Sequence, residues 1–512
     1  MGVSRQYNAV NDMVDGNVER GYGAKTAFID PMRSITYRQL QSESRRMASL
    51  LKALDIGQES RIALLLLDTV DYPISFWGAI RAGVVPVCLN TLLTTAQYKY
   101  ILADSRVQAL FVSAPLLAAV EPLFDQLKFL RHIIVVDDEN TDYTNFHEML
   151  NNSPAEFDTA DTCGDEAAFW LYSSGSTGDP KGVRHVHTSP IYVAENYGKG
   201  IIGIRHDDVC YSAAKLFFAY GLGAGMAIPM SVGATTVLLP DRPTPKSVLN
   251  TLKEQRPTLF FGVPTLYAAM LADENCTREN SSDRLRVCVS AGEALPKDVG
   301  LNWSERMGVD IIDGIGSTEM LHVFLSNRPD DIRYGTSGKE IPGYKLRLID
   351  EDGNDIDDGS LGELLVSGGS AGDGYWNQRA KSRATFAGEW THTGDKYTKD
   401  ADGYYHYCGR TDDMFKVSGR WVSPFEVEQA LTSHSGVLES AVVGEEDGDG
   451  LIKPKAFVVL NSQIPQDGMF DALKEHVKNA VGAWKYPRWI VFVDDLPKTA
   501  TGKIQRYKLR EK

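Results

Sequence analysis

A loop near residue 175 combines the residue types that bind phosphate. The sequence from Ser173 to Gly182 reads SSGSTGDPKG, with three glycines, four hydroxyl side chains and a lysine. Glycine lets the backbone approach a ligand closely, and converging N–H groups bind anions. The familiar nucleotide loop G-x-x-x-x-G-K-[ST] does not match, because Pro180 precedes Lys181 and Gly182 follows it. Composition alone leaves a mobile surface turn as an equal alternative.

Composition limits the classes of function. The chain has 512 residues, and single cores stop growing at roughly 250 to 300 residues, so we expect two or more domains. A net charge of −15 disfavours a broad surface for nucleic acid or anionic membrane. The longest dense apolar run, residues 62–67, is too short to span a bilayer, and residues 1–15 lack a signal-peptide core. We therefore expect a cytoplasmic protein, and six cysteines without C-x-x-C spacing indicate reduced thiols.

The elements that must position the loop follow a regular pattern. Up to about residue 400, amphipathic helix patterns alternate with short apolar strands, which predicts an α/β fold built on parallel sheets. Thr36 and Gln39 form a capping box, so we expect a helix to begin there. The predicted strands of this region are residues 61–67, 235–239, 258–263 and 286–290.

The character of the sequence changes near residue 410, where a polar stretch punctuated by glycine begins. A compact segment of about a hundred residues follows, a size typical of a small domain. We therefore expect two domains, residues 1–411 and 412–512, with the boundary at Asp412. The sequence Ser423-Pro424-Phe425-Glu426 predicts the start of a helix in the second domain. The predicted strands of that domain are residues 440–443, 455–460 and 489–493.

Four further motifs follow the loop along the chain. They read DGIGSTE (313–319), HTGD (392–395), GRTDDMFKVSG (409–419) and PKTATGK (497–503). Together with the loop they resemble the signatures of the adenylate-forming superfamily, which includes acyl-CoA ligases, peptide-synthetase adenylation domains and luciferases. The resemblance covers both expected domains. It implies an α/β chain with a large N-terminal domain of stacked sheets and a small, mobile C-terminal α+β domain.

This resemblance implies a two-step reaction. A carboxylate attacks the α-phosphorus of ATP to give an acyl-adenylate and pyrophosphate, and a thiol then displaces AMP. Both reactants of the first step are anions, so charge neutralisation and positioning should dominate. The implied cofactors and co-substrates are ATP, Mg²⁺ and coenzyme A.

The resemblance also implies roles for individual residues. Thr318 contacts the α-phosphate, Glu319 ligates Mg²⁺, and Lys503 inserts its ammonium between carboxylate, ribose and α-phosphate oxygens. Asp395 accepts both ribose hydroxyls with support from Arg410, and a turn aspartate is the alternative for Asp395. The β- and γ-phosphates are assigned to Ser174, Gly175, Ser176, Thr177, Gly178 and Lys181. The adenine side of the site is assigned to Ala291, Gly292, Glu293, Asp313 and Gly314.

The second domain is implied to rotate between the two steps. Asp412 matches the hinge of the family, and rotation brings Ser418 and Gly419 to the channel where the thiol of coenzyme A enters. A protein lysine acetyltransferase acting on Lys503 and a second copy of the chain in a homodimer are the protein partners we consider.

The acid substrate is implied by two local matches. IGSTEMLHVFLSN and PKGVRHVHTSP look most like bacterial benzoate-CoA ligases and their hydroxybenzoate or aminobenzoate counterparts. Aromatic side chains suit a flat ring, although ordinary core packing is an alternative for them and a hydrogen-bonded structural role is an alternative for His322. His185 and His187 are too few for a zinc site. The expected acyl pocket comprises Phe217, Phe218, Tyr220, Gly221, Gly316 and His322.

Other functions compete with this interpretation. A stand-alone adenylation enzyme that loads a carrier protein and a medium-chain fatty acyl-CoA ligase share the same motifs. A non-catalytic nucleotide-binding regulator would have little need of Lys503 and Glu319. A kinase is disfavoured by Pro180 and Gly182 in the loop, and it would release ADP rather than AMP.

Overall fold

The computed structural model describes residues 4–138, 142–173, 179–418, 420–461, 466, 468–482, 484–498 and 504–510. These residues form two compact units. The first holds the described chain up to Ser173, then Asp179–Leu346 and Val366–His392. The second holds Arg347–Leu365 and the described residues from Thr393 onward. The second unit thus includes residues that precede Asp412, and the predicted boundary at that residue stays a prediction.

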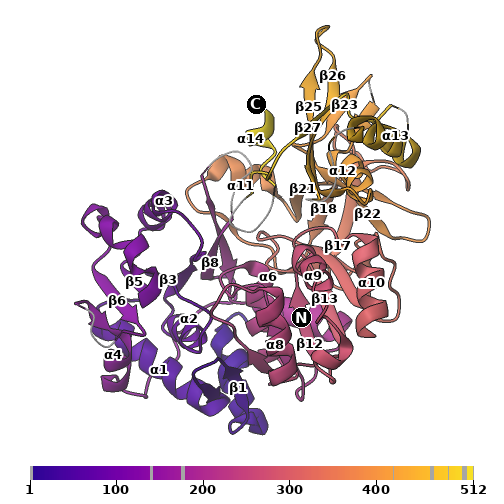
Figure 1. Ribbon diagram of the computed structural model, residues 1–512. Helices are drawn as coiled ribbons and strands as arrows, with labels where there is room; N and C mark the ends of the chain where they lie inside the picture. Colours follow the sequence, from indigo (N-terminus) through magenta and orange to yellow (C-terminus); the bar gives the residue numbers. More distant parts are fainter. Residues whose placement is uncertain are drawn as a thin grey trace. The chain divides into compact units, whose positions relative to one another are not determined.

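One sheet of the first unit has eight strands, and helices α1 (Tyr37–Ala53), α2 (Asp71–Arg81), α3 (Thr95–Ser105) and α4 (Phe146–Asn152) lie around it (Figure 1). Its central strands are parallel and fully buried, as their continuous apolar sequences require. An antiparallel hairpin at one edge departs from the expected parallel arrangement, because its short connection cannot make a parallel crossover. In sheet order the strands are β19 (Gly374–Tyr375), β9 (Lys181–Val186), β8 (Ala167–Ser173), β4 (Val85–Cys88), β3 (Arg61–Leu65), β5 (Ala109–Ser113), β6 (His132–Val136) and β7 (Thr144–Asn145).

The other large sheet has nine strands, and the run from β14 to β1 is parallel. Its core includes Tyr267 and Trp303, whose rings meet edge to face at 4.8 Å. In sheet order the strands are β16 (Lys339–Glu340), β15 (Val323–Ser326), β14 (Ile311–Gly316), β13 (Val287–Ser290), β12 (Leu259–Gly262), β10 (Val209–Ser212), β11 (Thr235–Val237), β1 (Thr26–Ile29) and β2 (Ser34–Thr36). The remaining helices of this unit are α5 (Ser189–Val193), α6 (Ala219–Leu222), α7 (Ile228–Met230), α8 (Pro245–Gln255), α9 (Pro264–Leu271), α10 (Lys297–Met307) and α11 (Arg379–Thr385).

The second unit is a smaller α+β body with its own apolar core. A hairpin of β23 (Phe415–Val417) and β24 (Arg420–Val422) precedes α12 (Pro424–Thr432). Strands β25 (Val437–Glu446), β26 (Ile452–Leu460) and β27 (Trp489–Phe492) form one sheet, with α13 (Met469–Val481) and α14 (Tyr507–Arg510) beside it. A further sheet, whose residues are divided between the two sets of ranges given above, contains β17 (Lys345–Ile349), β18 (Gly362–Ser367), β20 (Phe386–Ala387), β21 (Trp390–Lys399) and β22 (Tyr405–Arg410). Throughout the described parts of the chain, every helix is too short or too polar to cross a bilayer.

Local sequence signals predicted several elements correctly. The Thr36 hydroxyl accepts the N–H of Gln39, and the Gln39 side chain accepts the N–H of Thr36, so α1 begins with the expected capping box. The Ser423 hydroxyl accepts the N–H of Glu426 at the start of α12. Every predicted strand is present, but β25 is longer than residues 440–443 because its pairing with β26 continues beyond the apolar run.

Candidate active site

The predicted phosphate loop joins the two strands of the edge hairpin. Ser173 at the end of β8 faces Lys181 at the start of β9 in antiparallel register. Lys181 therefore stands where the loop returns to the sheet. The predicted loop residues Ser174, Gly175, Ser176, Thr177 and Gly178 lie outside the described residues.

A tyrosine joins two of the predicted site residues. The Tyr375 hydroxyl donates to Glu319 Oε1 at 2.7 Å, and Lys181 Nζ donates to the same hydroxyl at 3.3 Å. Lys181 Nζ also lies 4.5 Å from the centre of the Tyr375 ring and 3.9 Å from Glu319 Oε1. Both charged side chains are partly exposed, so a ligand can reach them. Sequence analysis missed Tyr375, because only the pairing of β19 with β9 brings it to Lys181.

We expect Tyr375→Phe to raise the KM for Mg-ATP roughly tenfold or more in the adenylation half-reaction, because a hydrogen bond to a charged group contributes about 1.5–3 kcal/mol. Pyrophosphate release at varied ATP concentration measures this effect. Tyr192→Phe is the matched control, since the Tyr192 hydroxyl donates to the carbonyl of Gly343. If both variants kept the wild-type KM, the Tyr375 hydroxyl would not position Glu319.

Two histidines of β9 and the turn after it bind backbone groups. The ring of His185 contacts the carbonyl of Thr318 through Nε2 at 2.9 Å and stacks on Phe169 with ring centres 5.1 Å apart. His187 Nδ1 accepts the N–H of Ala9 at 3.3 Å. Burial lowers the pKa of each histidine to about 4, so both rings are neutral at neutral pH. Through this contact with the Thr318 backbone, His185 holds the segment that carries Thr318 and Glu319.

The predicted adenine residues follow adjacent parallel strands. Ala291, Gly292 and Glu293 come directly after β13, and Asp313 and Gly314 lie in β14, where Asp313 pairs with the last residue of β13. The backbone of Gly292 has a positive φ of 96°, which favours glycine. A side chain at Gly314 would meet a neighbouring valine at 2.7 Å.

Asp313 carries a carboxyl group although the residue is only 5% exposed. Within the described residues its Oδ1 has no hydrogen-bond partner, and its Oδ2 accepts a long contact of 3.4 Å from the N–H of Leu295. Burial raises the pKa of Asp313 to about 8. Leu295, Ser290 and the backbone of Gly314 oppose this rise in pKa by hydrogen bonding. A buried polar atom without a partner is costly, so Oδ1 is a candidate contact for a ligand.

In the predicted acyl pocket, the ring of His322 lies near the rings of Tyr197 and Tyr220 and close to the backbone of Gly223. The ring of His322 lies 5.5 Å from that of Tyr220 and 5.3 Å from that of Tyr197, measured between centres. A methyl group at Gly223 would lie 2.1 Å from the His322 ring, so only glycine fits under it. Sequence analysis included Tyr220 and His322 but missed Tyr197 and Gly223, which contribute through packing alone.

His322 is 2% exposed, and neither ring nitrogen has a hydrogen-bond partner among the described residues. Burial lowers the pKa of His322 to about 3, so the ring is neutral and offers one N–H donor and one acceptor. A backbone hydrogen bond with Tyr220 also acts on the pKa of the ring, so the alternative of a structural histidine stays beside the pocket assignment.

The other predicted pocket residues lie just before α6, within α6 and at the end of β14. The rings of Phe217, which is buried, and Phe218, which is half-buried, are 4.4 Å apart. A methyl group at Gly221 would lie 2.0 Å from the carbonyl oxygen of Lys215, and one at Gly316 would lie 2.4 Å from that of His322. Both glycines are therefore required by backbone contact.

In the second unit, the predicted ribose residues are partners. Asp395 in β21 faces Arg410 in β22, and Arg410 Nη1 donates to Asp395 Oδ1 at 3.1 Å and to the carbonyl of Thr393 at 2.8 Å. Because Asp395 lies within a strand, the alternative of a turn aspartate is wrong. Its carboxylate is held in a defined orientation by a permanent cation.

The remaining predicted residues belong to the C-terminal part of the chain. Asp412 lies in the turn after β22, where its carbonyl accepts a hydrogen bond from Arg510 at 3.2 Å. Ser418 directly follows β23 and has a positive φ of 51°. Gly419 and Lys503 lie outside the described residues.

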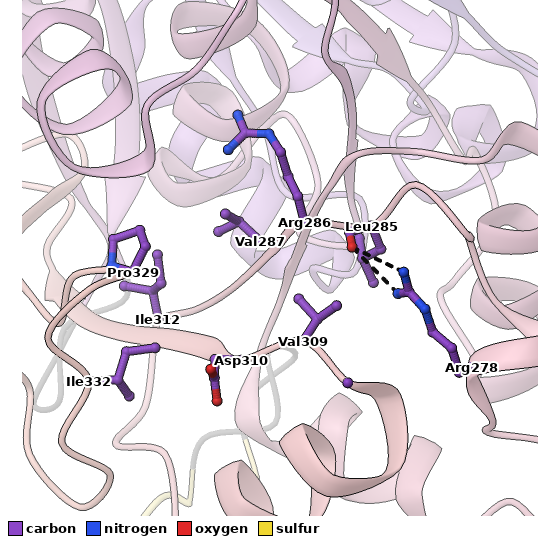
Figure 2. Close-up of a pocket in the computed structure, with 10 residues that line it drawn as sticks. Arg278, Leu285, Arg286, Val287, Val309, Asp310, Ile312, Pro329 and Ile332 are labelled. Carbon is purple, nitrogen blue, oxygen red and sulfur yellow. Dashed lines mark hydrogen bonds between the residues drawn. The ribbon is translucent and has the colours of Figure 1, made fainter.

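A cavity of about 270 Å³ lies elsewhere in the first unit, near the amino ends of β13 and β14 (Figure 2). Its cations already have partners: Arg278 donates to the carbonyl of Leu285, and Arg286 donates to Asp208. The predicted adenine residues stand at the opposite, carboxyl ends of the same strands, so this cavity is separate from the candidate active site. Its lining consists of Arg278, Leu285, Arg286, Val287, Gly308, Val309, Asp310, Ile312, Pro329 and Ile332.

Comparison with known proteins gives concordant matches. The family model described as AMP-binding enzyme matches residues 17–376, and the model of the AMP-binding enzyme C-terminal domain matches residues 426–503. A 4-hydroxybenzoate–CoA/benzoate–CoA ligase of Rhodopseudomonas palustris is 59% identical over 509 residues, which cover 99% of this chain and 94% of that protein. The crystal structure of a benzoate CoA ligase from Burkholderia xenovorans matches with a TM-score of 0.91 and 47% identity, over 98% of this chain and 100% of that one. An anthranilate CoA ligase in complex with anthranoyl-AMP matches with a TM-score of 0.95 and 42% identity, over 99% of this chain and 98% of that one.

Proposed function

Because the chain belongs to the AMP-binding enzyme family, we propose that it makes the coenzyme A thioester of a simple aromatic acid, with benzoate, 4-hydroxybenzoate and 2-aminobenzoate as the candidates. The chain is an acid–thiol ligase that uses ATP and coenzyme A. The observation that carries the choice of acid is the similarity, over nearly the whole chain, to a ligase named for 4-hydroxybenzoate and benzoate. In the proposed reaction the acid displaces pyrophosphate from ATP to give an aroyl-adenylate, and the thiol of coenzyme A then displaces AMP.

The first step requires that a carboxylate approach a triphosphate. In the proposed site, Lys181 and the hydroxyl-rich residues 174–178 bind the β- and γ-phosphates. Lys181 supports this role because its ammonium already lies beside a carboxylate in a partly exposed position. Neutralising the two anions and holding them in line lowers the barrier without covalent chemistry by the protein.

The carboxylate of Glu319 fits a hard divalent cation such as Mg²⁺, which prefers oxygen ligands, and Thr318 is proposed to contact the α-phosphate. The lysine ammonium 3.9 Å from Glu319 indicates that this position favours positive charge. Mg²⁺ supplies charge neutralisation of the phosphate oxygens when it is bound. Glu319 would hold the ion, and the Tyr375 hydroxyl would orient the carboxylate for that task.

The aromatic acid is proposed to lie among Phe217, Phe218, Tyr220 and His322. Ring walls suit a flat ligand, and edge-to-face contacts favour a ring over an alkyl chain. His322 supports this location, because its buried nitrogens lack partners among the described residues. With its low pKa the imidazole can donate one N–H to the substrate carboxylate without protonating it, so the carboxylate stays nucleophilic.

Asp395 is proposed to accept the two ribose hydroxyls, and Arg410 holds its carboxylate in place. Lys503 is proposed to stabilise the charge that develops between the attacking carboxylate and the α-phosphate. Ser418 and Gly419 are proposed to border the path of the coenzyme A thiol after rotation about Asp412. Acetylation of Lys503 and homodimer formation stay predictions.

Product analysis tests the proposed function. We expect ATP, Mg²⁺, coenzyme A and benzoate to give AMP and benzoyl-CoA, with 4-hydroxybenzoate and 2-aminobenzoate ranked by kcat/KM. Mass spectrometry resolves AMP, ADP and the thioester. Octanoate is the control acid: octanoyl-CoA alone would favour a fatty acyl-CoA ligase. Aroyl transfer to a purified carrier protein without coenzyme A would favour a stand-alone adenylation enzyme, and no AMP with any acid would favour a nucleotide-binding regulator.

A further inference from the structure

Asp68 is a buried carboxylate that the proposed reaction does not use. It follows β3 in the eight-stranded sheet and is 3% exposed. Both of its oxygens lie 3.3 Å from the backbone nitrogen of Leu216, which donates to them. Leu216 belongs to the segment after β10 in the nine-stranded sheet. One hydrogen-bonding carboxylate therefore connects the two large sheets of the first unit.

The segment that Asp68 holds also carries the proposed ring walls. Leu216, which is 1% exposed, immediately precedes Phe217 and Phe218. A turn follows in which the N–H of Phe218 donates to the carbonyl of Lys215 at 3.0 Å. Gly221 then packs against the same carbonyl so closely that no side chain fits. A shift of Leu216 would consequently displace both phenylalanine rings.

A cation on the same segment reinforces this contact. The Lys215 ammonium donates to the carbonyls of Leu239 and Asp241, so it is held on the side of the nine-stranded sheet. It attracts the Asp68 carboxylate electrostatically. Two successive residues therefore hold the segment: the Lys215 ammonium binds the nine-stranded-sheet side, and the N–H of Leu216 binds Asp68 beside the eight-stranded sheet.

We propose that Asp68 is a positioning residue for the acid substrate: by holding the N–H of Leu216 it keeps the rings of Phe217 and Phe218 in place and so sets the affinity and selectivity for aromatic acids. This inference rests on the proposed function, since it needs the aromatic acid to lie against these rings.

The ionisation of Asp68 provides a readout that a merely structural role would not give. Burial raises the pKa of Asp68 to about 6, although Lys215 and the N–H of Leu216 oppose the shift. Tyr72 and Tyr211 are the other titratable groups that interact with it, and burial keeps both uncharged. Below pH 6 the carboxyl group is neutral and accepts the N–H of Leu216 more weakly. The KM for the aromatic acid should therefore rise as the pH falls through about 6 in the wild type.

The test compares Asp68→Ala and Asp68→Asn with a matched buried carboxylate. Asp208 is also 3% exposed, but it precedes β10 at the other end of the strand and pairs with Arg286. We expect Asp68→Ala to raise the KM for benzoate about tenfold or more, with the KM for ATP changed less than about twofold. Asp68→Asn keeps one acceptor oxygen, so it should recover part of the loss, and its KM should no longer vary around pH 6. Asp208→Ala should lower Tm without a selective effect on benzoate.

The outcomes separate this inference from the proposed function. A wild-type enzyme that forms no adenylate with any aromatic acid would contradict the proposed function itself. If the wild type is active, two results would overturn only the role of Asp68. In the first, Asp68→Ala changes the KM for benzoate and the KM for ATP equally; in the second, it lowers Tm and leaves the KM for benzoate unchanged. Should Asp68→Ala fail to fold, Asp68→Asn and the pH profile of the wild type still decide the question: a KM for benzoate that is flat through pH 6 in the wild type contradicts the inference.

Discussion

Lys503→Ala should remove most of the aroyl-adenylate formation and leave the thioester step nearly intact. Loss of a single group that stabilises developing charge typically costs about 2.7–4 kcal/mol, or roughly 10²–10³ in rate. The described residues on either side of the predicted lysine segment are anchored, since Lys498 and Ile504 pair in an antiparallel bridge. Further along, Arg506 donates to Glu428 at 2.6 Å. The described residues on both sides of Lys503 are thus held in place.

Separate half-reactions measure this effect. Pyrophosphate release from ATP and benzoate reports the first step, and thioester formation from synthetic benzoyl-adenylate and coenzyme A reports the second. Lys498→Ala is the matched control, because this lysine of the same motif binds Glu439 and Asp495 near the surface. We expect the control to change either rate less than about twofold, as for a surface ion pair. Equal losses in both steps of Lys503→Ala would falsify the proposed role.

Asp412→Pro should have the opposite selectivity, with adenylate formation spared and thioester formation reduced by roughly 10²-fold or more, as expected when a conformational step is blocked. Proline restricts φ to about −65° and limits the residue before it, so the turn can no longer take a second backbone conformation. Thr411, Asp413 and Met414 donate backbone hydrogen bonds in this turn, and their N–H groups are kept in the variant.

Asp412→Ala distinguishes backbone rotation from side-chain chemistry. It removes the carboxylate but keeps φ and ψ free, so both half-reactions should remain within about threefold of wild type if Asp412 serves only as a hinge. Single-turnover thioester formation from preformed benzoyl-adenylate is the measurement. A hinge role is excluded if Asp412→Pro transfers the aroyl group as fast as Asp412→Ala does.

Local signals in the sequence were sufficient where structure is decided locally. The capping box at Thr36 needs only residues three positions apart, and α1 begins as predicted. Pairing between strands depends on partners far along the chain, and the sequence does not identify them. The pairing of β19 with β9 brings Tyr375 to Lys181 across 194 positions, and no local periodicity encodes that contact.

The residues of the candidate site also fall into two groups, those that a local motif predicted and those that depend on distant contacts. Motifs pointed to the residues for which we propose chemical roles, such as Glu319 and Asp395, because each lies in a short, specific sequence pattern. Residues that act by holding others gave no such signal. Asp68 lies 148 positions from Leu216. The requirement for glycine at position 223 follows only from the packing of the His322 ring against it in the folded protein. Supporting residues of this kind can be identified only in the folded structure.

Five buried ionisable groups of the first unit, His185, His187, His322, Asp68 and Asp313, have pKa values shifted toward their neutral forms, and this couples proton uptake or release to unfolding. Below about pH 6.5, unfolding lets His185, His187 and His322 take up protons that the native state refuses, so acid destabilises the fold through them. Between about pH 4 and their raised pKa values, Asp68 and Asp313 hold protons in the native state that the unfolded chain has released. Their contribution to stability is lost as the pH rises through about 6 and about 8, respectively. These opposing linkages place the greatest combined contribution of the five groups to stability near neutrality.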